Sequence, residues 1–266
     1  MAWYDGTLTA AAGQLKAILD AKLVLNAFWH IEDAAAGANI GVYHNYDPDN
    51  NVDYMVVISD NQADYASVAL WAGWDSGAHA GTGASWLSAT EYTINKTAGA
   101  YGLSVLDHRF IYVTKEPTRV DFYYVGQPLR FDVTKDMPMM TARDTATSEF
   151  GCGTAGPAAS SRYWLALRDE DGAKRSVAPT WYYSDSAKAS PFALTSDGRY
   201  LIRETPVWNL TSLKLIGLLE GVCGLGVSDY QGLANLDTVT DEDANVWLAL
   251  CGPTSAGRGV ALVRKS

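Results

Sequence analysis

The histidines, the residues of this chain best suited to catalysis or metal binding, are scattered along the sequence. Their spacing matches no catalytic or metal-binding motif. The four histidines lack the H-x-x-H or H-E-x-x-H spacing of a metal site. His79, in a glycine-rich stretch, is the best single candidate for a catalytic base, but no G-x-S-x-G sequence supplies a nucleophile for it. His30, within FWHIE, is most simply a strand residue. We therefore predict no catalytic residues, no metal ligands and no enzyme activity.

Two other patterns resemble ligand sites and lack the necessary context. Residues 151–156, GCGTAG, match the G-x-G-x-x-G of dinucleotide-binding turns, but no apolar strand precedes them, so we predict a loop and no cofactor. Residues 47–53, DPDNNVD, alternate oxygen ligands as an EF-hand does. Val52 replaces the required glycine and Ile58 the bidentate glutamate. An Asx-rich hairpin turn is the better interpretation, with a weak calcium site as the alternative.

Carbohydrate chemistry is the other possibility that the residue types allow. The acidic groups 169–171 and 241–243 read as solvated turns, and nothing selects a pair of carboxylates for glycoside hydrolysis. Trp71, Trp74 and Trp86 could together form an aromatic platform for a sugar. Because Trp71 and Trp74 are three residues apart, a regular strand would point them to opposite faces. We then expect at least one of them to lie in the core.

Composition excludes some classes of protein. The chain has 266 residues, a formal net charge of −10 and a pI of about 4.8. Nucleic-acid binding depends on Lys and Arg against phosphate, so we predict none. No apolar run reaches the roughly 18–20 residues of a membrane-spanning helix. The first residues do not resemble a secretory signal, so we expect the chain to stay where it is made or to leave by cell lysis. Three isolated cysteines, Cys152, Cys223 and Cys251, indicate small buried side chains.

The periodicity predicts a mainly β protein with one short helix. Residues 1–25 contain that helix: Thr9 is a plausible N-cap, and Leu15, Ile18, Leu19 and Leu23 share one face. Strands are then expected at 27–33, 38–46, 52–59 and 65–74, followed by a glycine-rich loop at 77–85. Many short antiparallel strands of this kind are typical of a β-sandwich.

The domain organisation follows from one change in composition. Residues 136–162 lose all periodicity and are rich in small side chains, so we predict a loop or linker. It separates an N-terminal unit, 1–135, from a C-terminal β unit, 163–266. The stretch TRVDFYYVGQPLRFDVT at 118–134 alternates on either side of Gly126–Pro128 and predicts a hairpin. One of its faces should fill a core, and the other should meet neighbouring subunits.

Several segments together resemble structural proteins of tailed bacteriophages. They are the opening MAWYDGTLTAAAGQLKAILDAKL, the strand FWHIED, the hairpin HRFIYVTKEPTRVDFYYVGQPLRFD, and the C-terminal stretch from IGLLEGV through GRGVALVRK. The resemblance covers about half the chain and consists of turn and strand signatures without catalytic content. It implies a virion protein of the tail, tail tip, baseplate or neck.

The resemblance also implies how the protein works. We expect a homo-oligomer that contacts other virion structural proteins, because aromatic-rich, Lys-poor surfaces suit stable interfaces. The residues expected at such an interface are Phe122, Tyr123, Tyr124, Leu129 and Phe131. A receptor- or carbohydrate-binding module of a phage tail is the alternative, and a polysaccharide hydrolase is a third possibility.

Overall fold

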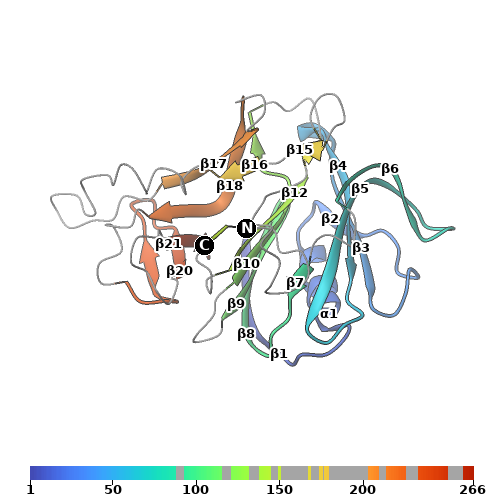
Figure 1. Ribbon diagram of the computed structural model, residues 1–266, viewed down its shortest axis with the longest axis horizontal. Helices are drawn as coiled ribbons and strands as arrows, with labels where there is room; N and C mark the ends of the chain where they lie inside the picture. Colours follow the sequence, from blue (N-terminus) through green and yellow to red (C-terminus); the bar gives the residue numbers. More distant parts are fainter. Residues whose placement is uncertain are drawn as a thin grey trace.

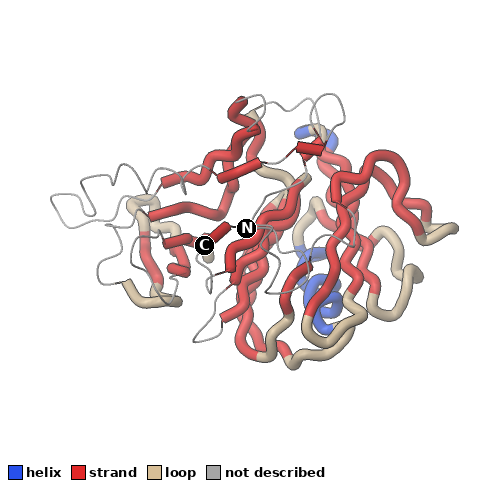
Figure 2. Tube along the Cα trace, viewed as in Figure 1, coloured by secondary structure: helices blue, strands red, loops and turns tan. Residues whose placement is uncertain are grey.

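The computed structural model confirms a mainly antiparallel β fold with one short helix near the N-terminus. The residues that it describes are 1–87, 93–115, 121–131, 138–144, 149–150, 167–168, 174–175, 177–179, 203–209, 214–225, 233–250 and 260–266. Figure 2 shows that strands dominate these residues and that helix is confined to short segments. None of the described helices has the length and apolarity that a membrane-spanning helix requires.

Three antiparallel sheets form the fold. The central sheet runs β1 (Ala2–Leu8), β8 (Gly99–Leu106), β9 (Arg109–Lys115), β10 (Asp121–Gly126), β12 (Met139–Asp144), β13 (Glu149–Phe150). The helix-side sheet runs β2 (Trp29–Ile31), β3 (Ile40–Asp47), β4 (Val52–Ser59), β5 (Tyr65–Asp75), β6 (Ala80–Leu87), with β7 (Thr93–Asn95) also paired to β5. The C-terminal sheet runs β16 (Val177–Pro179), β17 (Arg203–Asn209), β18 (Lys214–Leu225), β21 (Val260–Arg264), β20 (Val246–Leu250), β19 (Thr238–Thr240). A separate ribbon pairs β14 (Leu167–Arg168) with β15 (Lys174–Arg175).

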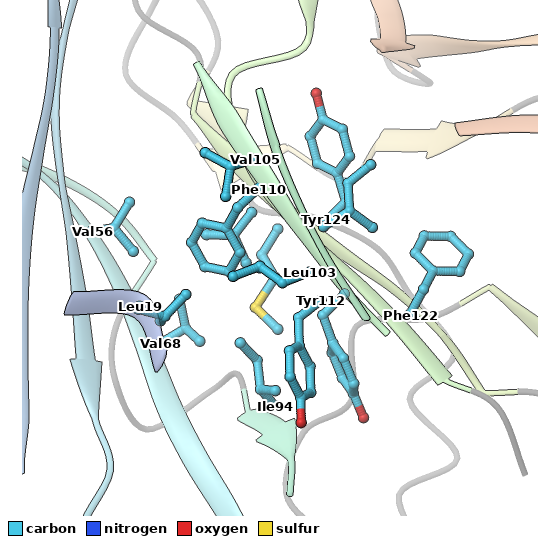
Figure 3. Close-up of a cluster of buried hydrophobic side chains, with 14 of the residues drawn as sticks. Leu19, Val56, Val68, Ile94, Leu103, Val105, Phe110, Tyr112, Phe122 and Tyr124 are labelled. Carbon is cyan, nitrogen blue, oxygen red and sulfur yellow. The ribbon is translucent and has the colours of Figure 1, made fainter. Parts of the chain in front are cut away.

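The central sheet lies between the other two, as Figure 1 shows. Its strands β8, β9 and β10 are mostly buried on both faces. Phe110 and Tyr112 of β9 lie on the face toward Val56 and Val68 of the helix-side sheet (Figure 3). Ile111 lies on the opposite face, close to β18 of the C-terminal sheet. A Cβ atom added at Gly221 of β18 would be 3.1 Å from Ile111 Cδ1. Strands in such a position lose the apolar–polar alternation, because neither face meets water.

The helix fills one end of the space between the central and helix-side sheets. The α1 helix (Gln14–Lys22) continues into a 3-10 turn, η1 (Leu23–Leu25). Leu15, Leu19 and Leu23 are completely buried, which confirms the predicted apolar face. Thr9 is not the N-cap, because the helix begins after Gly13, which has a φ of 80° that glycine adopts without strain.

A buried ion pair lies near the start of the helix. Lys96 and Asp60 are both fully buried, and the Lys96 ammonium contacts the Asp60 carboxylate. It also donates to the carbonyl oxygens of Ala11, at 2.9 Å, and Gln62, at 2.5 Å. Asp60 accepts a hydrogen bond from the backbone N–H of Lys16 at 3.0 Å. These contacts hold the helix start against two loops of the helix-side sheet.

The structure differs from the predicted elements in three places. Residues 80–85 of the loop predicted at 77–85 belong to β6, and residues 139–144 of the predicted 136–162 linker form β12 of the central sheet. Gly126–Pro128 is a crossover between sheets instead of a hairpin turn. β10 pairs with β9 and β12, whereas β11 (Leu129–Arg130) pairs with β18 of the C-terminal sheet. Local alternation predicts a strand but cannot identify the strand with which it pairs.

The two predicted units, 1–135 and 163–266, share one hydrophobic core. Leu219 and Val222 of β18, Leu248 of β20 and Val263 of β21 belong to the same buried cluster as Phe110 and the helix leucines.

Candidate functional site

The outer face of the helix-side sheet is turned away from the core. It carries the aromatic and histidine side chains that are best placed to bind a ligand. Its centre is a small apolar cluster of Val42, Val57 and Ala69. Trp71 and Trp74, both partly buried, pack against this cluster. The two tryptophans were expected on opposite faces of a regular strand. A β-bulge between Trp71 and Gly73 shifts the register of β5 against β6, which accounts for their shared face.

The third member of the proposed aromatic platform, Trp86, belongs to β6, and its side chain lies outside the described part of the structure. The other two are held by specific contacts. The indole N–H of Trp74 donates to Asp33 Oδ2 at 2.8 Å. The Trp71 ring lies over Gly81, where a Cβ would approach the indole to 2.2 Å. The bulge and this glycine thus leave the tryptophans side by side on one face.

Asp33 connects the aromatic face to His79, the candidate base. His79 Nδ1 lies 2.7 Å from Asp33 Oδ2, and the Ala35 N–H donates to Asp33 Oδ1 at 2.9 Å. Hydrogen bonds from His79 and then Trp74 lower the pKa of the Asp33 carboxyl, because they favour its charged form. His79 has a φ of 51°, in the left-handed region. The contacts described here pair His79 with a carboxylate and include no nucleophile for it to activate. We interpret them as fixing the conformation of the loop around His79.

A second histidine group lies at the edge of the same face. His30 Nε2 and His44 Nδ1 are 2.9 Å apart, and Glu32 Oε2 lies 3.3 Å from His44 Nδ1 and 3.8 Å from His30 Nε2. On its other side, His44 Nε2 lies 2.8 Å from Asp53 Oδ1. Burial and then repulsion from a protonated His44 lower the pKa of the His30 imidazole. Among the described residues, these three side chains form the group whose ligand atoms converge as a metal site requires.

Sequence reasoning missed this histidine group because His30 and His44 have no local spacing motif. A usable signal was present in part: His30 and Glu32 are two residues apart, so a strand points both to one face. His44 joins them only through the antiparallel pairing of β2 with β3, which places His30 opposite His44.

The DPDNNVD stretch is the predicted Asx-rich turn. Asp47 caps the 3-10 turn η2 (Pro48–Asn50) by accepting hydrogen bonds from the N–H groups of Asp49, at 3.1 Å, and Asn50, at 3.3 Å. Burial tends to raise the pKa of Asp47, but hydrogen bonds from Asn50, together with His108 and Asp49, lower it overall. Asn51 follows with a φ of 51°. These oxygens are therefore used to close the β3–β4 hairpin.

The five residues predicted for a subunit interface divide into two groups. Phe122, Tyr123 and Tyr124 of β10 are buried in the core of this chain, with at most 4% exposure, because the central sheet is covered on both faces. They are therefore not available at its surface, which corrects the prediction for these three. Leu129 and Phe131 are exposed, at 49% and 57%.

Leu129, the first of the exposed pair, lines a hollow of the C-terminal sheet. The hollow has a volume of about 320 Å³, and its apolar lining includes Leu129, Leu218 and Trp247. Acidic side chains border it, among them Glu220 and Asp241. Glu220 forms an ion pair with Arg109 at 2.7 Å.

The Asp241 carboxylate closes the β19–β20 turn. It accepts hydrogen bonds from the N–H groups of Asp243 and Asn245 and from the side chains of Asn245 and Trp247, at 2.8 to 3.0 Å. Burial tends to raise its pKa, but the hydrogen bonds from Trp247 and Asn245 lower it overall. The turn predicted at 241–243 is confirmed, and Glu220 and Asp241 have structural partners.

Several other predictions fall on residues outside the described ranges. They concern the glycine-rich motif at 151–156, the acidic group 169–171, Cys152 and Cys251. Cys223 is described and is buried, as expected.

Comparison with known proteins identifies no relative. No protein-family model matches the sequence, and no curated protein matches it. The function must therefore be argued from the residues and surfaces described above.

Proposed function

We propose that this chain is a non-enzymatic structural component of a tailed-phage particle that assembles as a homo-oligomer. The observation that carries the proposal is the exposure of Leu129, which lines the partly apolar hollow of the C-terminal sheet, and of Phe131, two residues further along the chain. Exposed large side chains next to a hollow are typical of surfaces that bind another protein. The occupant that we propose is a second copy of the chain. The resemblance of the sequence to tail, baseplate and neck proteins supports the same conclusion.

The polar groups near these surfaces serve the fold. Glu220 pairs with buried Arg109, Asp241 closes a turn, and Asp47 closes a hairpin. The described part of the hollow offers shape and apolar area, and two of its carboxylates, those of Glu220 and Asp241, are engaged in contacts within the fold. Such a surface suits association more than catalysis, because a general acid or base must be free to reach a substrate.

The oligomeric state tests the proposal. Size-exclusion chromatography with light scattering should show that the purified chain forms a defined oligomer. Leu129→Ser and Phe131→Ser should each weaken association by at least tenfold. Leu25→Ser is the matched control, because Leu25 is an exposed leucine, at 65%, outside this surface, and association should not change. Mass spectrometry of purified particles should find the chain at several copies per particle.

Two results would contradict the proposal. One is a wild-type chain that is monomeric at every concentration. The other is an oligomer that Leu129→Ser, Phe131→Ser and Leu25→Ser affect equally.

A second candidate function is carbohydrate or receptor binding, which the shared face of Trp71 and Trp74 favours. Aromatic faces stack on the apolar faces of sugar rings, and the buried Asp33 carboxylate holds the Trp74 ring by accepting a hydrogen bond from its indole N–H. Titration with host-envelope glycans should then quench tryptophan fluorescence in wild type and less in Trp71→Ala. An equal response in both proteins would exclude this platform.

A further inference from the structure

We propose that His30, Glu32 and His44 bind a divalent transition-metal ion of the zinc class at the edge of the helix-side sheet. The site is separate from the proposed association surface, and its presence or absence does not depend on that function.

The sheet itself brings the three side chains together. β2 is the edge strand, and its pairing with β3 places His30 directly opposite His44. Side chains that are opposite each other in an antiparallel pair have Cβ atoms about 5 Å apart. Glu32 lies two residues beyond His30, on the same face, and its N–H continues the ladder to the Val42 carbonyl at 2.9 Å.

The ligand atoms have the spacing that a metal ion requires. Zinc binds imidazole nitrogen and carboxylate oxygen at about 2.0–2.2 Å, and tetrahedral geometry then separates the ligand atoms by about 3.3 Å. The three separations here, 2.9, 3.3 and 3.8 Å, bracket that value. One ion can therefore touch all three atoms after small side-chain adjustments.

Asp53 prepares His44 for this role. Its carboxylate oxygen lies 2.8 Å from His44 Nε2 and favours the tautomer that carries its proton on that nitrogen. In that tautomer, His44 Nδ1 is a hydrogen-bond acceptor, and it lies 3.3 Å from a second acceptor, Glu32 Oε2. The two acceptors then share one donor, an N–H of His30. A cation between them satisfies both. Carboxylate–histidine pairs of this kind orient metal ligands in many proteins.

The donor set and its exposure define the ion. Two imidazoles and one carboxylate suit Zn²⁺, Co²⁺, Ni²⁺ and Cu²⁺, whereas Ca²⁺ and Mg²⁺ prefer oxygen ligands alone. The side chains of His30, Glu32 and His44 are 50%, 31% and 17% exposed, so solvent reaches the group. With three protein ligands, a fourth position is left for water or for a group from another molecule.

Metal binding to the purified full-length chain tests the proposal. The protein should carry no polyhistidine tag and be treated with a chelator before Zn²⁺ is added in competition with a chromophoric chelator at pH 7.5. We expect one equivalent bound per chain and a thermal midpoint raised by roughly 5–10 °C at about a hundred times the dissociation constant. Co²⁺ should give the intense visible absorption of a tetrahedral complex.

Matched variants locate the ion. His30→Gln and His44→Gln should each weaken binding by more than tenfold, and Asp53→Asn by roughly tenfold to a hundredfold with the stoichiometry kept. His79→Gln removes a histidine outside the group and should leave binding unchanged. His30 is half exposed, so His30→Gln is the variant of choice if His44→Gln fails to fold.

Two outcomes overturn the proposal. Absence of saturable Zn²⁺ binding would mean that a proton alone joins these side chains. Binding that persists unchanged in His30→Gln would place the ion elsewhere on the chain.

Discussion

Replacing Lys96 with methionine should destabilise the protein strongly. Methionine retains most of the aliphatic length of lysine, but the substitution leaves the Asp60 carboxylate and the carbonyls of Ala11 and Gln62 without the ammonium that they now contact. The Asp60 carboxylate keeps its hydrogen bond from the Lys16 N–H. Lys96 and Asp60 are fully buried, so water cannot replace the lost contacts. Removing one partner of a buried ion pair costs about 3–5 kcal/mol.

Urea denaturation followed by circular dichroism measures this loss in the free energy of unfolding. Lys16→Met is the control, because Lys16 pairs with Asp20 near the surface, with side chains 19% and 28% exposed. That variant should lose only about 0.3–0.5 kcal/mol. Adding Asp60→Asn to Lys96→Met should recover part of the loss, because no charge is then buried alone. A loss below about 1 kcal/mol in Lys96→Met, typical of an exposed pair, would refute the reasoning.

Two further variants test the crossover and the aromatic face. Gly126→Ala should cost more than about 2 kcal/mol, because φ is +126° and the new Cβ would lie 2.5 Å from the backbone oxygen of His108. Gly77→Ala, whose Cβ would meet only the Asp75 side chain at 3.3 Å, should stay within about 0.5 kcal/mol, and equal losses in the two would contradict the account. The lowered pKa of Asp33 means that its carboxylate stabilises the fold above about pH 4 and that this contribution is lost as pH falls through the folded-state pKa. Asp33→Asn should therefore lose less stability than wild type between about pH 5 and pH 2, and parallel urea-midpoint curves would exclude this role.

The proposed association surface and the proposed metal site both consist of residues that the fold leaves at least partly exposed. Leu129 and Phe131 remain at the surface because β11 leaves the central sheet and joins β18. The zinc-class site lies on β2 and β3, at an edge of a different sheet. Loss of one function by substitution should therefore leave the other intact, which allows the two proposals to be tested separately.

The helix, several strands and one turn could be predicted from the amino-acid sequence alone. Leu15, Leu19 and Leu23 recur at helical spacing, and the helix buries all three. Strand periodicity predicted β4 at its exact bounds and β3 and β5 within two residues of theirs, because alternating side chains suit a sheet with one buried face. The Asx-rich turn after β3 was also predictable, since the Asp47 side chain closes it by accepting hydrogen bonds from the N–H groups of Asp49 and Asn50.

The contacts between side chains from different strands became visible in the three-dimensional structure alone. The pairing of β2 with β3 joins His30 to His44, and a bulge in β5 accompanies the shared face of Trp71 and Trp74. Stacking of the C-terminal sheet on the central sheet buries Tyr124, which alternation alone left on an open face. Strand pairing and sheet stacking join residues that are distant along the chain. A local pattern carries the period of a strand but not the identity of its partners.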